Sequence, residues 1–378
     1  MNYTNFKGKK ISRLGFGMMR LPMDADGNID YAAGQEMIDY ALTEGINYID
    51  TAYKYHEGES ENFVGAALSK HPRDSYYLAD KMPCWLCESR EDVSRIFEEQ
   101  LSKCRVDYFD FYLLHSLGDG DLETVEKIQA IEYLLTEKEA GRIGHLGASF
   151  HCTPEFLREV LTKYGDALEF IQLQLNYMDW DINGAKALYE VAREFNKPVI
   201  VMEPLRGGML AKPLSQAACQ ILDDASSCGY PSYALRFVNE QEGILCTLSG
   251  MSELDCLKEN IEIFSGPAMT DAEKSAIDEA VKVLQADILV PCTGCNYCYE
   301  CPQEIKIPEI FKMYNEAASK GFHWIWGSLS NQYNQVQPNG KDCIGCGSCE
   351  SHCPQKIHII DKLKEIDAKY KELAEIGE

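Results

Sequence analysis

Short hydrophobic runs recur along the first two thirds of the chain, at intervals of roughly thirty residues. Their length and their branched and aromatic content are typical of strands buried on both faces of a parallel sheet. A weaker run at 14–18 is expected to lie in an N-terminal hairpin, and residues 211–232 are too irregular to assign. The clear runs occupy residues 46–50, 76–80, 109–114, 143–148, 170–174, 199–203 and 245–249.

Between these runs, hydrophobic residues recur every three or four positions, as on the buried face of a helix. The clearest example covers residues 122–135, and Gly141 is expected to end that helix. Similar stretches follow at 253–264 and 272–284. Strands and helices that alternate over about 250 residues predict an α/β fold, either a (β/α)8 TIM barrel or a doubly wound sheet.

Composition and charge narrow the classes of function. The chain has 378 residues, of which 45% are hydrophobic, so it can bury a large core. Its formal net charge of -24 repels phosphate backbones and anionic lipids, so we expect neither a nucleic-acid partner nor a membrane partner. The first ten residues are polar and no run of eighteen apolar residues occurs, which predicts a cytoplasmic location.

Half of the sixteen cysteines fall in two motifs near the C-terminus, each followed by a proline. In a reducing compartment such clusters indicate metal ligands rather than disulfides. Three cysteines at every third position are typical of 4Fe-4S clusters, whereas structural zinc usually takes two separated pairs. The first motif is Cys292, Cys295, Cys298 and Cys301, and the second is Cys343, Cys346, Cys349 and Cys353.

The second motif matches that of bacterial two-cluster ferredoxins, in which the last cysteine of each motif binds the other cluster. That rule assigns Cys353 to the first cluster and Cys301 to the second, although the first motif is one residue shorter before Cys301. We therefore expect two domains: a barrel at 1–285, and a small α+β ferredoxin-like domain at 286–378 with a helical insert and a C-terminal helix. The spacing leaves open whether the clusters carry electrons or only stabilise the fold.

Four polar residues lie at or just beyond the carboxyl ends of successive predicted strands, where barrel enzymes place their active sites. They are Asp50, Tyr55, Lys81 and His115. Singly, each has an ordinary alternative, such as a helix cap, a solvated lysine or a core histidine. Together, in this order and spacing, they resemble the catalytic residues of the aldo-keto reductase family, and the resemblance extends over nearly all of residues 11–285.

The resemblance implies a TIM barrel that reduces a small carbonyl, or oxidises the alcohol, by hydride transfer with NAD(P)H. Tyr55 would donate the proton, and the Lys81 ammonium would lower the pKa of that phenol. Asp50 would hold Lys81, and His115 would orient the carbonyl oxygen. The cysteine motifs place the chain in the iron-sulfur branch of the family.

The resemblance also implies dinucleotide contacts. Ser149, Gln172 and Asn176 match positions that bind the nicotinamide carboxamide, and Met202 stands where the family often stacks an aromatic ring. Arg206, followed by two glycines, could meet the pyrophosphate or could be a surface arginine in a tight turn. Residues 248–254 contain no cation for a 2′-phosphate, which favours NADH over NADPH.

Other functions stay open at this stage. The barrel could be a catalytically silent docking scaffold for an electron-transfer protein, or a flavin could occupy its mouth. By barrel geometry the last helix ends away from the catalytic face, so the clusters are expected to exchange electrons with an external ferredoxin or flavodoxin. Cys84 and Cys87 form a further CxxC, which is either a redox pair or two core thiols.

Overall fold

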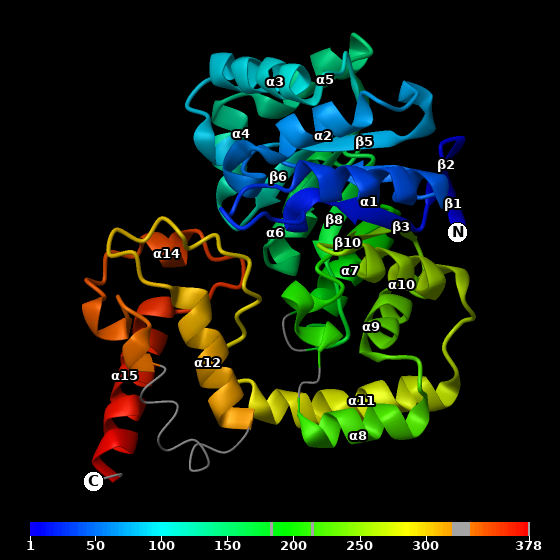
Figure 1. The fold of residues 1–378 in the computed structure, drawn as a ribbon. Helices are drawn as coiled ribbons and strands as arrows, with labels where there is room; N and C mark the ends of the chain where they lie inside the picture. The colour runs from blue at the N-terminus through cyan, green and yellow to red at the C-terminus, as the bar shows by residue number, and fades with distance from the viewer. Residues whose placement is uncertain (182–183, 213–214, 320–332, 377–378) are drawn as a thin grey trace. The chain divides into compact units, whose positions relative to one another are not determined.

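The computed structural model describes residues 1–181, 184–212, 215–319 and 333–376 (Figure 1). Contacts divide the chain into two compact units. The barrel unit comprises Met1–Leu205 and Pro231–Met269, and the cysteine unit comprises Arg206–Tyr230 and Thr270–Glu378. Each unit is therefore built from two separate segments, which alternate along the sequence. The domain boundary expected at residue 285 concerns independent folding and stays a prediction.

In the described part of the barrel unit, eight parallel strands close into a barrel in the order β10-β3-β4-β5-β6-β7-β8-β9. This confirms the predicted TIM barrel and excludes the doubly wound sheet. The strands are β3 (Leu14–Gly17), β4 (Tyr48–Asp50), β5 (Tyr77–Met82), β6 (Phe109–Leu117), β7 (Ile143–Phe150), β8 (Phe170–Gln174), β9 (Val199–Met202) and β10 (Ile244–Gly250).

The expectation that residues 14–18 belong to a hairpin is wrong. The hairpin consists of β1 (Tyr3–Phe6) and β2 (Lys9–Ser12), whereas β3 pairs in parallel with β10 and β4 and closes the barrel. All four residues of β3 are buried, because the barrel interior covers one face and helices cover the other. The ring of Phe6 lies 6.0 Å from that of Phe111 and 6.4 Å from that of Phe170, so the hairpin covers the amino end of the barrel.

Helices surround the strands, as the alternating pattern predicts (Figure 1). The helix expected over 122–135 is in fact two helices, because Gln129 adopts a left-handed φ of 54° between them. The helices of this part of the chain are α1 (Tyr31–Thr43), α2 (Ser60–Leu68), α3 (Arg90–Cys104), α4 (Asp121–Lys127), α5 (Ala130–Glu139), α6 (Pro154–Tyr164), α7 (Ala185–Glu194), α9 (Tyr230–Asn239) and α10 (Leu254–Ser265).

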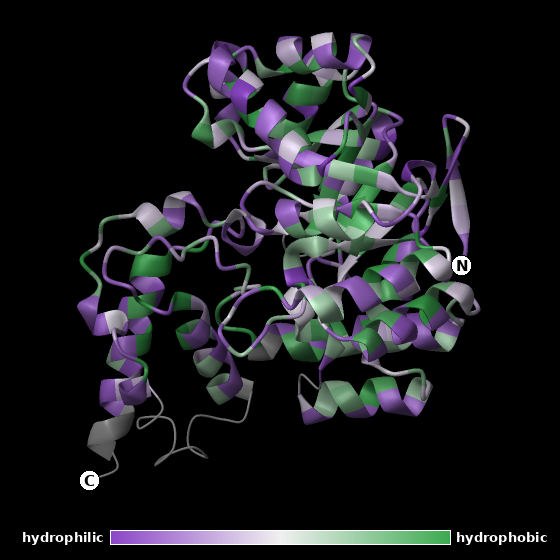
Figure 2. Cartoon of the chain, turned by 45° about the horizontal axis from the view of Figure 1, so that its top comes forward, coloured by the Kyte–Doolittle hydropathy of each residue, from purple (hydrophilic) through white to green (hydrophobic). Residues whose placement is uncertain are grey.

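The barrel unit has two hydrophobic layers, and Figure 2 shows hydrophobic residues concentrated on the strands and on one side of each helix. One layer fills the barrel and includes Tyr48, Phe111, Phe170 and Leu245. The other lies between the strands and the helices. Because the interior is packed, the site can form only at the carboxyl ends of the strands.

In the cysteine unit, α8 (Gln216–Ala225) lies in the stretch that the sequence left unassigned, and it packs against α11 (Asp271–Asp287) (Figure 1). A separate small core joins α12 (Ile307–Ser319) to α15 (Ile359–Ile376). The short helix α14 (Ser348–Ser351) carries part of the second cysteine motif. Residues 320–332 of the expected insert lie outside the described residues. Among the helices that the structure describes, none could span a membrane.

Candidate active site and cysteine centres

Lys81 and Asp50 form a buried ion pair between neighbouring strands. The Lys81 side chain is fully buried, and its Nζ donates to Asp50 Oδ1 at 2.6 Å and to the Thr51 carbonyl at 2.7 Å. The parallel pairing of β4 with β5 holds the two strands in register, with Asp50 beside Ala79. Burial raises the pKa of Asp50, and the charge of Lys81 opposes that shift.

Tyr55 begins a short 3-10 helix, η2 (Tyr55–Gly58), and its ring centroid lies 5.1 Å from Lys81 Nζ. Burial raises the pKa of Tyr55 well above its usual value, and the charges of Asp50, Asp80 and Glu203 add to that shift. The net shift is thus upward, and the expected lowering of this pKa by Lys81 stays a prediction. The phenol stays protonated at neutral pH, as a proton donor must.

His115 lies within β6 and completes the group. Its ring centroid is 6.1 Å from that of Tyr55, at an interplanar angle of 82°, and 5.1 Å from the ring of Trp85. Burial and the charge of Lys81 hold the pKa of His115 well below its ordinary value, so the imidazole is neutral. Its Nδ1 is buried and has no hydrogen-bond partner in the described part of the chain. The structure thus brings together all four residues predicted from the sequence.

A second buried network on α2, α3 and β5 supports Lys81, and the sequence pattern did not predict it. Asp80 and Glu61 are both fully buried. Asp80 Oδ1 accepts from the Lys81 N–H at 2.8 Å, while Gln100 Nε2 donates to Glu61 Oε1 at 2.8 Å and to the Lys81 carbonyl at 3.0 Å. Lys103 Nζ reaches Glu61 Oε2 at 3.2 Å.

Asp80 and Glu61 interact directly, and this places two carboxyl groups where water cannot screen their charges. Burial raises the pKa of Asp80 well above its usual range, and the charge of Glu61 adds to that shift. Burial also raises the pKa of Glu61. The pair therefore binds a proton more readily than two exposed carboxylates would. The signal in the sequence was an aspartate inside the otherwise apolar run 76–80.

The three residues expected to bind the carboxamide differ in whether their polar side-chain atoms already have hydrogen-bond partners within the protein. Ser149 Oγ accepts from the Ser116 N–H at 2.7 Å. The side chain of Asn176 donates to Asp179 Oδ2 and to the Glu203 carbonyl, and its Oδ1 accepts from two backbone N–H groups. Gln172 is buried, and its Oε1 has no hydrogen-bond partner among the described residues. Gln172 is therefore the one of these three with an unpaired acceptor, and that oxygen is buried.

Met202 and Arg206 lie at and beyond the end of β9. Met202 Sδ accepts from Gln172 Nε2 at 3.4 Å, so these two predicted residues are neighbours. Arg206 is not a surface arginine: its side chain is only 2% exposed, and Nη2 donates to the Pro291 carbonyl at 3.3 Å. The guanidinium is thus engaged inside the cysteine unit.

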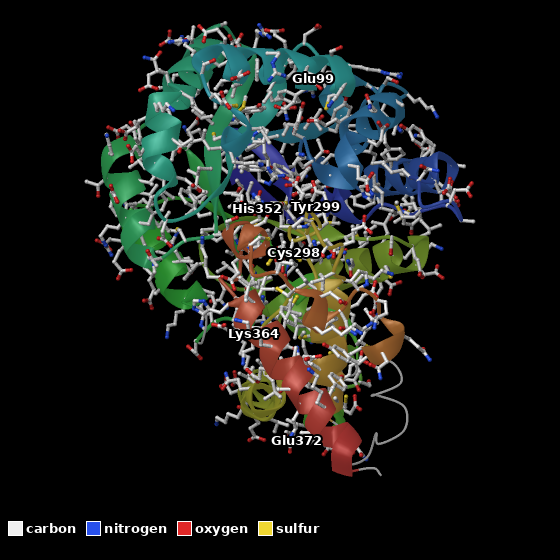
Figure 3. All side chains as sticks on the ribbon, turned by 90° about the vertical axis from the view of Figure 1, so that its left-hand side faces the viewer. Glu99, Cys298, Tyr299, His352, Lys364 and Glu372 are labelled. Atoms are coloured by element: carbon white, nitrogen blue, oxygen red, sulfur yellow. The ribbon has the colours of Figure 1, made fainter. Side chains whose placement is uncertain are left out.

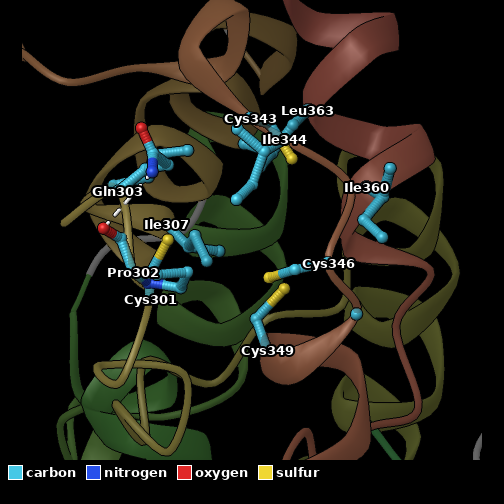
Figure 4. Close-up of a pocket in the computed structure, with 12 residues that line it drawn as sticks. Cys301, Pro302, Gln303, Ile307, Cys343, Ile344, Cys346, Cys349, Ile360 and Leu363 are labelled. Carbon is cyan, nitrogen blue, oxygen red and sulfur yellow. Dashed lines mark hydrogen bonds between the residues drawn. The ribbon is translucent and has the colours of Figure 1, made fainter.

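Cysteines of both motifs line one pocket of about 310 Å³, part of it open to solvent (Figure 4). Cys301 comes from the first motif, and Cys343, Cys346 and Cys349 come from the second. Figure 4 shows Cys346 and Cys349 directing their sulfurs toward one another. Burial raises the pKa of Cys349 to about 11, with the charges of Glu350 and of the other three cysteines adding to the shift.

The remaining four motif cysteines interact around Cys298, which is labelled in Figure 3. Burial raises the pKa of Cys298 to about 12, and the charges of Cys295, Cys292 and Cys353 add to that shift. As free thiols, both groups would resist ionisation. An iron cluster supplies the positive charge that turns such thiols into thiolates. Each set contains one cysteine from the other motif, as the ferredoxin rule predicts.

Cys84 and Cys87 flank the 3-10 helix η4 (Cys84–Leu86) and are both buried. Burial raises the pKa of Cys84 above its usual range and that of Cys87 to about 11. Both thiols are protonated at neutral pH, and a protonated thiol is a poor nucleophile. This favours two core thiols over a redox pair.

Comparisons with known proteins agree with this geometry. The model of the aldo/keto reductase family matches residues 13–282, and that of a 4Fe-4S dicluster domain matches residues 291–358. The chain is 25% identical over 305 residues to the uncharacterized oxidoreductase YqkF of Bacillus subtilis, covering 72% of this chain and 93% of that protein. It is 24% identical over 324 residues to the NADH-specific methylglyoxal reductase of Escherichia coli, covering 73% and 96%.

Among solved structures, the aldo-keto reductase AKR11C1 from Bacillus halodurans in its holo form matches with a TM-score of 0.61 and 24% identity. The match covers 72% of this chain and 93% of that one. At this identity the likeness concerns the fold.

Replacing Asp80 by Asn should remove part of the pH dependence of barrel stability. Because folding raises the pKa of Asp80, its contribution is fully present below the unfolded pKa of about 3.9 and is lost as the pH rises through the folded pKa. We expect the free energy of unfolding, measured by urea titration from pH 5 to pH 9, to fall less steeply in Asp80→Asn than in the wild type. The exposed Asp255→Asn is the control, and a curve for Asp80→Asn parallel to it would contradict the raised pKa of Asp80.

Proposed function

The chain belongs to the aldo/keto reductase family and carries a 4Fe-4S dicluster domain, and from that premise we propose that it reduces a small carbonyl substrate with a nicotinamide dinucleotide, or oxidises the corresponding alcohol. The observation that carries the proposal is the buried group formed by Asp50, Lys81, Tyr55 and His115. An intact group of this kind favours a reductase over a silent docking scaffold.

When bound, the dinucleotide supplies the hydride that reduces the carbonyl carbon. The protein must then neutralise charge on the carbonyl oxygen. Tyr55, held protonated by burial, donates its proton to that oxygen. His115, neutral at physiological pH, can donate one N–H to the same oxygen and orient it. Lys81 stabilises the phenolate that remains, and Asp50 keeps Lys81 in place.

Gln172 is the strongest candidate for holding the carboxamide, since its Oε1 is open while Asn176 is fully engaged. A carboxamide N–H could donate to that oxygen, and Met202 beside it could pack against the ring face. The absence of a cation in residues 248–254 favours NADH. The name of the NADH-specific relative from Escherichia coli supports the same preference.

We propose two 4Fe-4S clusters with crossed ligands. The first would be held by Cys292, Cys295, Cys298 and Cys353, and the second by Cys343, Cys346, Cys349 and Cys301. The mutual charges within each group and the shared pocket support this assignment. Ile344, which lines the second pocket, is 63% exposed, and we propose an external one-electron carrier such as a ferredoxin or flavodoxin as the redox partner of the clusters.

Tyr55→Phe should lower the kcat of carbonyl reduction by about a hundredfold or more, because only the proton donor is removed. Dinucleotide binding and the iron content should be unchanged. Tyr53→Phe is the matched control, since the Tyr53 hydroxyl bonds to Glu99 instead. Activity of Tyr55→Phe within tenfold of the wild type would overturn the assignment of the donor.

Cys295→Ser and Cys346→Ser should each remove one cluster, because a serine oxygen is a poor ligand for iron in this setting. Iron should fall from about eight atoms per chain toward four in each variant. Cys256→Ser, at an exposed position outside both motifs, is the control. An unchanged iron count in either test variant would reject that ligand.

Without an external partner, NADH should not bleach the cluster absorbance at the rate of turnover, because a hydride carries two electrons and a cluster accepts one at a time. Dithionite should bleach it. Anaerobic stopped-flow absorbance with excess NADH makes the measurement, and bleaching as fast as turnover would establish direct coupling instead.

A further inference from the structure

The segment that enters the first cysteine motif is held from two sides. On one side, Asn315 of α12 brackets Val290, accepting from its N–H at 2.9 Å and donating to its carbonyl at 2.7 Å. On the other side lies the 3-10 segment η5 (Arg206–Ala211), which begins four residues after the end of β9. Residues far apart in the sequence thus fix the backbone immediately around Cys292.

Arg206 holds the residue before Cys292. Its side chain is among the largest that are fully buried, and its Nη2 donates to the Pro291 carbonyl at 3.3 Å. The backbone of Arg206 has a left-handed φ of 49°, which a residue other than glycine adopts only at a cost. Burial, a hydrogen bond to the backbone and a strained conformation together indicate that this arginine positions its neighbours and is not a solvated residue in a turn.

Gly207 lies against the residue after Cys292. A Cβ placed on Gly207 would lie 1.8 Å from the Thr293 carbonyl oxygen, so no side chain can be accommodated unless Thr293 moves. Gly208 is the natural contrast. It too has a positive φ, of 90° against 65° for Gly207, but its Cβ would meet no described atom within 4 Å. The close approach is therefore specific to Gly207.

Thr293 lies between Cys292 and Gly294, and the Gly294 N–H donates to Cys292 Sγ at 3.4 Å. Hydrogen bonds to the sulfur ligands help set the reduction potential of a 4Fe-4S cluster, because they stabilise the more negative reduced form. The position of Thr293 therefore controls a bond that affects the electron affinity of the first cluster.

We infer that Arg206 and Gly207 are positioning residues for the first cluster: they fix Pro291 and Thr293, and so keep the Gly294 N–H on the Cys292 sulfur. The inference rests on the proposed clusters and assigns to the Arg206–Gly208 segment a role other than binding pyrophosphate. We expect Arg206 and Gly207 to affect the reduction potential of the first cluster and not that of the second.

The test compares Gly207→Ala with Gly208→Ala in the full-length chain loaded with iron and sulfide. Electron paramagnetic resonance during a redox titration reports each cluster, and Cys295→Ser and Cys346→Ser identify which signal belongs to which. In Gly207→Ala, the ratio of reduced to oxidised first cluster at the wild-type midpoint should fall by about threefold or more, or the first signal should disappear while the second persists. Gly208→Ala should leave both midpoints in place.

Arg206 provides a second, independent variant. Arg206→Gln should shift the first cluster in the same direction, and Arg206→Lys should restore part of the shift because it keeps a donor near Pro291. Equal effects of Gly207→Ala and Gly208→Ala, or equal shifts of both clusters, would overturn the inference. A wild-type protein that binds no clusters would instead reject the proposed function, so the two failures are distinguishable.

Discussion

The barrel site depends on the buried ion pair between Lys81 and Asp50. Moving two charges out of water costs several kcal/mol per ion, so such a pair persists only where further hydrogen bonds complete it. The Thr51 carbonyl provides one for Lys81, and the parallel pairing of β4 with β5 fixes the geometry. Burial, with the Lys81 charge adding to it, keeps His115 neutral. Burial raises the pKa of both Asp80 and Glu61, which disfavours a further uncompensated negative charge in this region.

The barrel and the four residues of the candidate site could be predicted because both follow from local pattern. A buried strand has a recognisable length and composition, and the carboxyl ends of parallel strands meet at one face. A polar residue at each end is therefore brought to that face by the fold alone. The strand at 14–17 was misplaced because a short run beside a hairpin carries no sign of its distant partner β10.

Properties that depend on burial and on hydrogen-bond satisfaction could not be predicted. Asn176 has the residue type of a ligand contact, but the fold engages both ends of its amide. The sequence left Arg206 either at a pyrophosphate or on the surface, and only the structure shows its side chain buried and bonded to the Pro291 carbonyl. Asp80 and Glu61 are nineteen positions apart in the sequence, and only the packing of α2 on β5 makes them neighbours. The cysteines of each motif lie near one from the other motif, as the crossing rule predicts from spacing, while the ligand sets themselves stay a proposal.

The order in which the chain visits its two units has a consequence during synthesis on the ribosome. Helix α8 packs against α11, yet about 45 residues separate the end of one from the start of the other. Since synthesis adds roughly 5–20 residues per second, the apolar face of α8 stays without its partner α11 for several seconds. The cysteine motifs emerge later still. All eight barrel strands are therefore synthesised before the first cysteine motif, and a nascent chain stalled before α11 should be a target for chaperones.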